Sequence, residues 1–241
     1  MIMSNQEIAL IVLRGKRSTA NSLATTIEFF RDREFTVVDP MPPWSNDRNF
    51  DETYESMLLQ LNQQVQDLKN SRAKKIVLVG QSFGANCIFA YLSLYADIDA
   101  AVTMAPAHFP DRMYQNNHSI RILVDLARKL ARKGQSSFEI AFNDSSADNM
   151  KRINTTVENF LSYFDPAGLA NMYNTIPQIT RSIPILYISA QDDEQRDNGD
   201  NKVSMLPENE KTKYVKSDQT HFRVGISHNE EILEFIKSLD S

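Results

Sequence analysis

Short apolar runs recur along the chain and are separated by stretches with helical spacing. Each run is a few residues long and rich in β-branched side chains, which is typical of a strand buried on both faces of a parallel sheet. The more polar segment KYVK at residues 213–216 predicts a last short strand. The five apolar runs are residues 7–13, 35–38, 76–79, 98–105 and 183–189.

Helical periodicity fills the gaps between most of these strands. Apolar positions recur every three or four residues from about residue 50 to 70, after residue 84, and again after residue 229. Strands therefore alternate with helices, and the connections are long enough for crossovers. The pattern predicts an α/β fold with one mostly parallel sheet of about six strands and helices on both faces.

Residues 107–180 break this alternation. They hold two helical stripes and no clear strand, and they are too long for a simple crossover. We expect a helical lid inserted over the carboxyl edge of the sheet, with residues 1–106 and 181–241 forming the core of a single domain. The first stripe is basic between Arg121 and Lys133. Its cations form either a solvated face or, as the less common role, a site for an anionic substrate tail.

The sequence Gly80-Gln81-Ser82-Phe83-Gly84 joins the third apolar run directly to a helix. A strand, Gly-x-Ser-x-Gly and a helix make a nucleophile elbow, whose sharp turn exposes the serine hydroxyl. Gly80 and Gly84 carry no Cβ, so the strand and the helix can approach each other. The helix begins just past the serine, so the N–H of Phe83 faces the place where an oxyanion would form. The alternative is a tight turn without chemistry, but with only 7 Gly in 241 residues a chance match is uncommon.

A nucleophilic serine needs a base, and the base needs a carboxylate that orients it. His221 lies in the loop after the last strand, as the chain order Ser, Asp or Glu, His requires. His228 begins the last helix and is better explained as a cap or surface residue. Asp192 and Asp193 close the preceding strand. Adjacent aspartates cannot both face the ring, so we predict Asp193 as the acid, with Asp192 as the alternative.

Composition narrows the class of protein. The 26 Lys and Arg against 31 Asp and Glu give a net charge of −5, which offers no electrostatic case for nucleic acid. Cys87 is the single cysteine, so no intrachain disulfide forms. No apolar run approaches the roughly 18 residues of a membrane span. The first residues lack the basic region of a signal peptide, so a cytoplasmic location is the expectation.

Three segments together resemble the α/β-hydrolase superfamily: GQSFG at 80–84, AQDD at 190–193 and TH at 220–221. The resemblance covers nearly the whole chain. In the acid motif of that family, Gly-x-x-Asp, Ala190 takes the place of the Gly and Asp193 that of the Asp. The resemblance implies an inserted lid and the hydrolysis of an ester, a thioester or an amide.

The resemblance also assigns the second oxyanion donor to the loop after the first strand. This loop reads Arg14-Gly15-Lys16 in place of the His-Gly common in the family. The N–H of Gly15 or of Lys16 would be the donor, although a glycine that merely permits a tight turn explains the sequence equally well. Two residues near strand ends are candidates for substrate binding, Trp44 and His108. For Trp44, packing against the sheet is the more ordinary alternative.

The sequence therefore predicts a serine hydrolase that acts on a small-molecule carboxylic ester or thioester. Ser82 would attack the carbonyl and form an acyl-enzyme, with His221 as base and Asp193 as its orienting acid. This chemistry needs no cofactor and no metal ion. Two other functions use the same residues, namely a ligand-binding protein without turnover and an acyltransferase. Lid residues set the acyl and leaving groups on this fold, and the pattern carries no signal for an oligomeric state.

Overall fold

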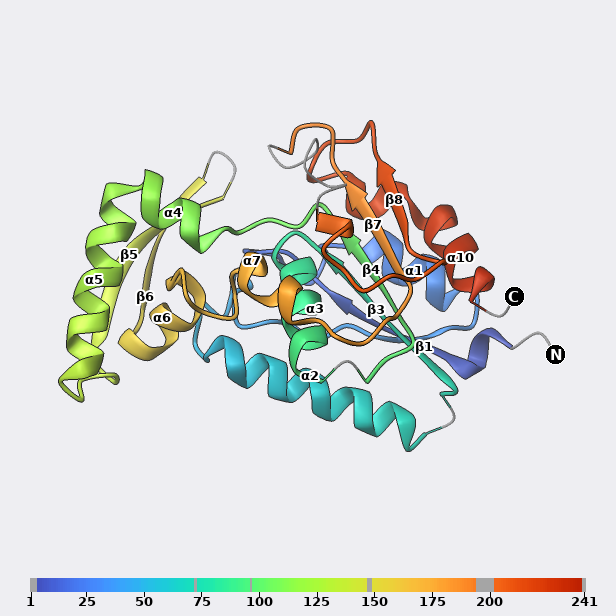
Figure 1. Cartoon of the computed structure of the whole chain (residues 1–241), viewed down its shortest axis with the longest axis horizontal. Coiled ribbons are helices and arrows are strands. Elements are labelled where there is room, and N and C mark those ends of the chain that lie inside the picture. The colour runs from blue at the N-terminus through green and yellow to red at the C-terminus, as the bar shows by residue number, and fades with distance from the viewer. Residues whose placement is uncertain (1–3, 72, 96, 147–148, 194–201, 240–241) are drawn as a thin grey trace.

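Six strands form the central sheet of the computed structural model, in the order β2-β1-β3-β4-β7-β8 (Figure 1). Every pair of neighbours in this sheet is parallel, which confirms the predicted α/β class and number of strands. The strands are β1 (Ile8–Leu13), β2 (Thr36–Val38), β3 (Lys75–Gln81), β4 (Ala100–Met104), β7 (Ile185–Ser189) and β8 (Lys213–Lys216). The structure describes residues 4–71, 73–95, 97–146, 149–193 and 202–239.

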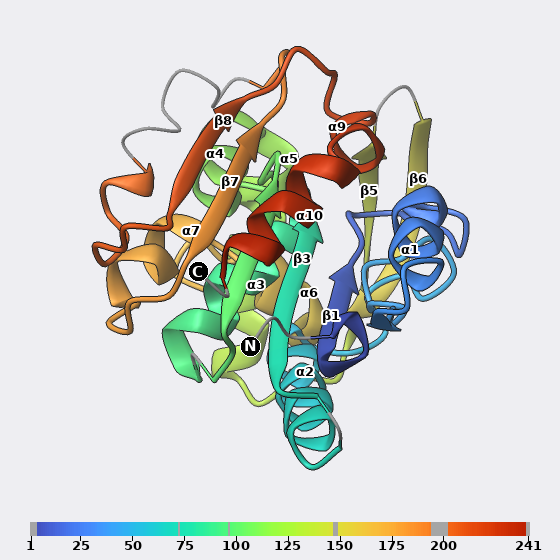
Figure 2. The ribbon, with the colours of Figure 1, turned by 90° about the vertical axis from the view of Figure 1, so that its right-hand side faces the viewer.

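The central strands feed two separate hydrophobic cores, because successive residues of a strand point to opposite faces of the sheet. Along β3, Ile76 and Leu78 enter one core, and Val77 and Val79 enter the other. Helices α2 and α3 cover the first face and α1 and α10 the second, and Figure 2 shows α10 crossing in front of the sheet. These helices are α1 (Ala24–Arg31), α2 (Tyr54–Lys69), α3 (Phe83–Leu94) and α10 (Asn229–Ser238). Within the described part of the chain, no helix combines the length and the apolar character needed to cross a membrane.

Parallel pairing brings the carboxyl ends of β3, β4, β7 and β8 to one edge of the sheet. The register aligns Gln81 with Met104, Met104 with Ile188, and Ser189 with Lys216. The loops that follow these strands therefore open side by side. They carry Ser82, Asp193 and His221, which are far apart in the sequence.

The segment between β4 and β7 holds helices and a two-stranded sheet; the sheet and the first helices lie at one end of the molecule, and the last helix returns to α3 (Figure 1). Its main elements are α4 (Pro110–Asn116), α5 (His118–Arg132), β5 (Glu139–Ser146), β6 (Asn149–Thr156), α6 (Val157–Phe164) and α7 (Met172–Thr175). Further short elements in the described part of the chain are the 3-10 helices η1 (Asn5–Glu7) and η2 (Ile176–Gln178), together with α9 (Val224–Ser227).

The expectation that residues 107–180 contain no strand is wrong, because β5 and β6 pair as an antiparallel hairpin. The inserted segment is therefore not wholly helical. Phe142 and Ile153 lie directly opposite each other in the hairpin and are buried, whereas most of their neighbours are polar. Ile153 also fits the helical stripe that continues at Val157, but the helix begins only there, after a cap by the Thr156 side chain.

Aromatic side chains attach the inserted segment to the core. The Tyr163 hydroxyl donates a hydrogen bond to the main-chain oxygen of Glu52 at 2.8 Å. The ring of Phe50 contacts those of Phe142 and Phe164, with centroid distances of 5.9 and 5.7 Å. These contacts join the loop before α2 to both the hairpin and α6.

Candidate active site

Ser82 occupies a strained turn between β3 and α3. Its φ is +56° and its ψ is −120°, a conformation that costs a residue with a side chain about 1–3 kcal/mol. The two flanking glycines make the turn possible. A Cβ at Gly84 would lie 2.2 Å from the main-chain oxygen of Leu13, and one at Gly80 would lie 2.6 Å from the oxygen of Gly84. The sequence therefore folds into the predicted elbow because only glycine fits on either side of it.

Ser82, His221 and Asp193 form a continuous chain of hydrogen bonds. The His221 Nε2 lies 3.0 Å from the Ser82 Oγ, and the His221 Nδ1 lies 2.8 Å from the Asp193 Oδ1. The other oxygen of Asp193 accepts the main-chain N–H of Ala190 at 3.1 Å. Because an ionised carboxylate only accepts, Nδ1 carries a proton and Nε2 is free to accept the serine hydroxyl.

The neighbouring carboxylate takes a different place. Asp192 accepts the main-chain N–H of His221 at 2.7 Å and does not contact the ring. Of the two predicted acids, the structure brings Asp193 to the imidazole. The link between Asp192 and the His221 main chain could not be predicted from sequence.

The predicted oxyanion residues surround the same hydroxyl. Phe83 is the first residue of α3, where main-chain N–H groups have no partner within the helix. Gly15 packs directly on Ser82, since a Cβ there would lie 3.0 Å from the Ser82 Cβ and 3.5 Å from its Oγ. Gly15, Lys16 and Phe83 all line the cavity in front of Ser82.

No protein-family model matches the chain, and no curated protein matches it in sequence. Solved structures do share its fold. DcsB, solved in complex with its substrate analogue, is 14% identical over 97% of this chain and 93% of that chain, with a TM-score of 0.68. A monoacylglycerol lipase from Paleococcus ferrophilus is 15% identical over 96% of this chain and 94% of that chain, with a TM-score of 0.67. The α/β hydrolase GrgF from Penicillium sp. sh18 is 16% identical over 96% of this chain and 88% of that chain, with a TM-score of 0.66.

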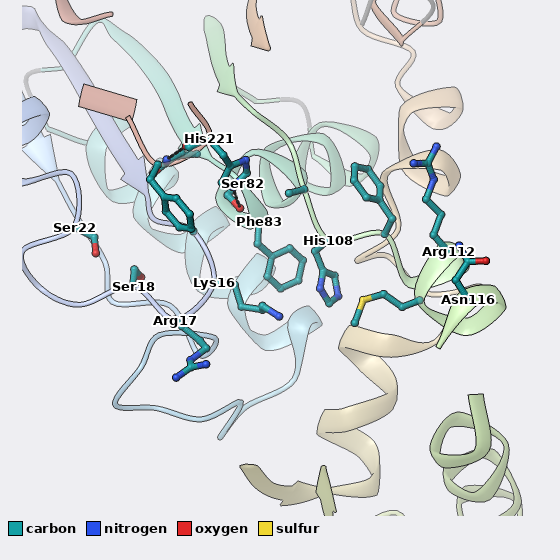
Figure 3. A pocket seen from close by; sticks show the side chains of 16 residues that line it. Lys16, Arg17, Ser18, Ser22, Ser82, Phe83, His108, Arg112, Asn116 and His221 are labelled. Atoms are coloured by element: carbon teal, nitrogen blue, oxygen red, sulfur yellow. Dashed lines mark hydrogen bonds between the residues drawn. The ribbon is translucent and has the colours of Figure 1, made fainter. Parts of the chain in front are cut away.

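The chain has the α/β-hydrolase fold. In this α/β-hydrolase fold the cavity beside Ser82 has a volume of about 600 Å³. Figure 3 shows Ser82 and His221 at one side of it, Phe83 and His108 at its centre, and Arg112 and Asn116 across from them. Arg112 and Asn116 belong to α4, so the inserted segment forms one wall of the cavity. Among the described residues, α5 contributes nothing to the wall, and its Arg128 is paired with Asp165.

Trp44 lies in the core and not in the cavity wall. It is fully buried, and its ring contacts that of Phe83 at 4.7 Å between centroids. Its indole Nε1 donates a hydrogen bond to the main-chain oxygen of Arg14 at 2.9 Å, and its own main-chain oxygen accepts the N–H of Arg17 at 2.8 Å. Of the two roles considered for Trp44, the structure supports packing, and it adds support for the loop that carries Gly15.

His108 does line the cavity. Its ring lies 4.2 Å from that of Phe83, and its Nε2 donates to the main-chain oxygen of Tyr163 at 2.7 Å. Burial, together with the charge of Lys16, lowers the pKa of His108 from 6.5 to about 3. The imidazole is therefore neutral at physiological pH. With Nε2 as the donor, its Nδ1 is an acceptor.

The other sequence candidates lie elsewhere. His228 bonds to the Ser217 Oγ and to Glu231, both at 2.7 Å. Contrary to the expectation, it is neither a side-chain cap nor a surface residue, because its side chain makes no cap bond to α10 and is only 15% exposed. A feature that sequence did not indicate is Lys202, which is only 2% exposed. Its Nζ lies 3.5 Å from the hydroxyl of Tyr187, and burial, with Arg112 nearby, lowers its pKa from 10.5 to about 8.

Proposed function

We propose that the protein is a serine hydrolase that cleaves a carboxylic ester or thioester through an acyl-enzyme. The observation that carries the proposal is the hydrogen-bonded chain from Ser82 through His221 to Asp193, which stands on a strained elbow and opens into a cavity. The structural neighbours include a protein named as a monoacylglycerol lipase and one named as an α/β hydrolase, which supports the same class of reaction.

The reaction proceeds in two halves. In the first, the Ser82 Oγ attacks the substrate carbonyl while the His221 Nε2 takes its proton. The imidazolium then gives this proton to the departing alcohol or thiol, and the acyl group stays on Ser82. In the second half a water molecule attacks the acyl carbon, His221 takes the proton of the water, and the carboxylic acid leaves. Asp193 orients the imidazole and stabilises the imidazolium whenever it forms.

The oxyanion is held by main-chain groups. The N–H of Phe83, at the amino end of α3, is one donor. The N–H of Gly15 or of Lys16, in the loop that packs on Ser82, is the second. Phe83 and His108 line the space where the acyl or the leaving group lies. The neutral imidazole of His108 offers a single acceptor there.

The test combines active-site labelling with turnover. A fluorophosphonate probe should label the parent protein and not Ser82→Ala. The control is Ser93→Ala, on the same helix, whose hydroxyl bonds to the main-chain oxygen of Ala90. A chain-length series of p-nitrophenyl esters beside acyl-thioesters should show turnover, with kcat lower by about 10⁴ or more in Ser82→Ala.

One outcome contradicts the proposed nucleophile, and two others point to the alternative functions. Labelling of Ser82→Ala as strong as that of the parent removes Ser82 from the role of nucleophile. Intact protein that shows no burst with any activated acyl ester favours a ligand-binding protein without turnover. Transfer of the acyl group to added alcohols or thiols in preference to water indicates an acyltransferase.

A further inference from the structure

Side chains hold both main-chain polar groups of His221. Its N–H donates to the Asp192 Oδ1 at 2.7 Å, and its oxygen accepts from the Gln81 Nε2 at 2.8 Å. These two bonds are separate from the ring contacts with Ser82 and Asp193. Hydrogen bonds therefore fix His221 both at its ring and at its main chain.

The two side chains come from the segments that carry the partners of the ring. Gln81 is the last residue of β3 and directly precedes Ser82. Asp192 directly precedes Asp193 in the loop after β7. Each side chain therefore fixes the distance from the His221 backbone to the very segment that its ring must reach.

The side chain of Gln81 occupies a space that is open because residue 225 is a glycine. A Cβ at Gly225 would lie 2.9 Å from the Gln81 Cδ and 2.6 Å from the Leu23 Cδ2. The main-chain oxygen of Gly225 also accepts the Thr26 hydroxyl at 2.6 Å, in a buried bond. The segment around α9 is thus held against α1, and the absence of a side chain at Gly225 leaves room for Gln81 to reach His221.

Such support matters because His221 lies in a loop between β8 and α9, without a helix or a strand around it. A catalytic group must stay within about 0.5 Å of its working position, and loops hold side chains less exactly than strands do. We propose that Gln81 and Asp192 are positioning residues that clamp the backbone of His221 and so keep its ring between Ser82 and Asp193. The clamp rests on the proposed function for its kinetic consequences, but not for its structural ones.

Variants of Asp192 distinguish the effect of its hydrogen bond from the effect of its negative charge. Asp192→Ala should lower kcat by about 10- to 100-fold with little change in KM, because a displaced base slows the chemical step and not substrate binding. Asp192→Asn keeps an acceptor oxygen and should stay within about threefold of the parent protein. The control is Asp218→Ala, which removes an equal charge from the loop that carries His221; the carboxylate of Asp218 accepts a hydrogen bond from the Gln219 side chain. If Asp192→Asn is as slow as Asp192→Ala, the charge matters and the main-chain bond does not. This result overturns the proposed positioning role of Asp192.

Variants of Gln81 test the hydrogen bond that its Nε2 donates to the main-chain oxygen of His221. Gln81→Met has a similar length and cannot donate, so it should lower kcat by about tenfold or more with KM little changed. Gln81→Glu places a carboxylate against the carbonyl of His221 and should be at least as slow. The control is Gln66→Met on α2, which removes a comparable bond from the Gln66 Nε2 to Asp97, at 2.9 Å. A Gln81→Glu variant with the same kcat as the parent overturns the proposed positioning role of Gln81.

A spectroscopic readout decides the clamp without turnover. The proton between the His221 Nδ1 and Asp193 should give an NMR signal downfield of the amide region in the parent protein. We expect it to exchange with solvent about tenfold faster in Asp192→Ala and Gln81→Met, because the loop opens more often. Equal exchange rates in the parent and in both variants overturn the clamp. If the parent neither turns over nor reacts with the fluorophosphonate, the proposed function fails, while this measurement still decides the clamp.

Discussion

The Lys16 ammonium group pairs with the Asp144 carboxylate at 2.6 Å, and this pair joins the loop beside Ser82 to β5 of the inserted segment. Their side chains are 15% and 2% exposed, so the pair is largely removed from water. One residue beside the proposed oxyanion donors is in this way tied to a hairpin 128 positions later in the chain.

Loss of one partner of this pair should be costly. Lys16→Met leaves the Asp144 carboxylate buried beside an apolar group, and we expect the free energy of unfolding to fall by about 3 kcal/mol. Lys16→Met combined with Asp144→Leu should recover most of that loss, since no charge is then left buried. Urea unfolding of the parent, both single variants and the double variant measures the coupling. Losses that simply add would show that the pair makes no energetic contact.

Trp44 should support the loop of the proposed oxyanion donors through one hydrogen bond. Trp44→Phe keeps most of the aromatic packing but leaves the main-chain oxygen of Arg14 without its indole donor. We expect a loss of about 1–3 kcal/mol in unfolding free energy and slower labelling by the fluorophosphonate. The matched control is Tyr54→Phe, which removes a buried hydroxyl beside Trp44 that donates to no main-chain oxygen among the described residues. Equal stability of Trp44→Phe and the parent protein would contradict the prediction.

His108 should make the fold sensitive to acid. Burial lowers its pKa to about 3, so between that pH and about 6.5 the unfolded chain binds a proton that the folded chain does not. Stability is therefore lost as the pH falls from 6.5 toward 3. His108→Gln keeps a donor for the Tyr163 oxygen and removes this proton. The urea midpoint of the variant should fall less than that of the parent between pH 7 and pH 5, whereas His118→Gln, at an exposed site, should behave as the parent does.

Lys202 should make the stability of the fold depend on pH in the alkaline range. With its pKa lowered to about 8, the folded chain binds fewer protons than the unfolded chain between that pH and 10.5. The cost of its buried charge is complete below pH 8 and is relieved as the pH rises through this window. Lys202→Met should raise the thermal midpoint at pH 7, and its advantage over the parent should shrink by pH 10. Lys213→Met, at an exposed position on β8, is the control; an advantage that stays constant with pH would argue against the prediction.

The sheet could be predicted because burial marks its strands directly. Every residue of β1 is buried, as is every residue of β4 and of β7, so their composition is apolar apart from Thr103 and Ser189. The hairpin of β5 and β6 gave no comparable signal. Only a few of its residues, such as Phe142 and Ile153, pack inward, and Ile153 also continues the spacing of α6.

At the candidate site, too, some residues could be predicted from a sequence pattern and others only from the structure. Ser82 was marked by its glycines, and His221 by its place after the last strand. The hydrogen bonds of Gln81 and Asp192 end on main-chain atoms of His221, which every residue possesses. Such bonds leave no pattern of residue types, so the path of the loop had to be known. Trp44 was ambiguous because a strand-end loop can turn either toward a cavity or back onto the sheet.

Strands β4 and β7 are direct neighbours in the sheet, although 80 residues, Ala105 to Pro184, connect them. All of this connection lies outside the segments that carry Ser82, Asp193 and His221. It contributes no strand to the central sheet, so the order and the register of the six central strands do not depend on its length. Because α4 lies within this stretch and lines the cavity, a change confined to one continuous piece of coding sequence would reshape the cavity wall and leave Ser82, Asp193 and His221 in place.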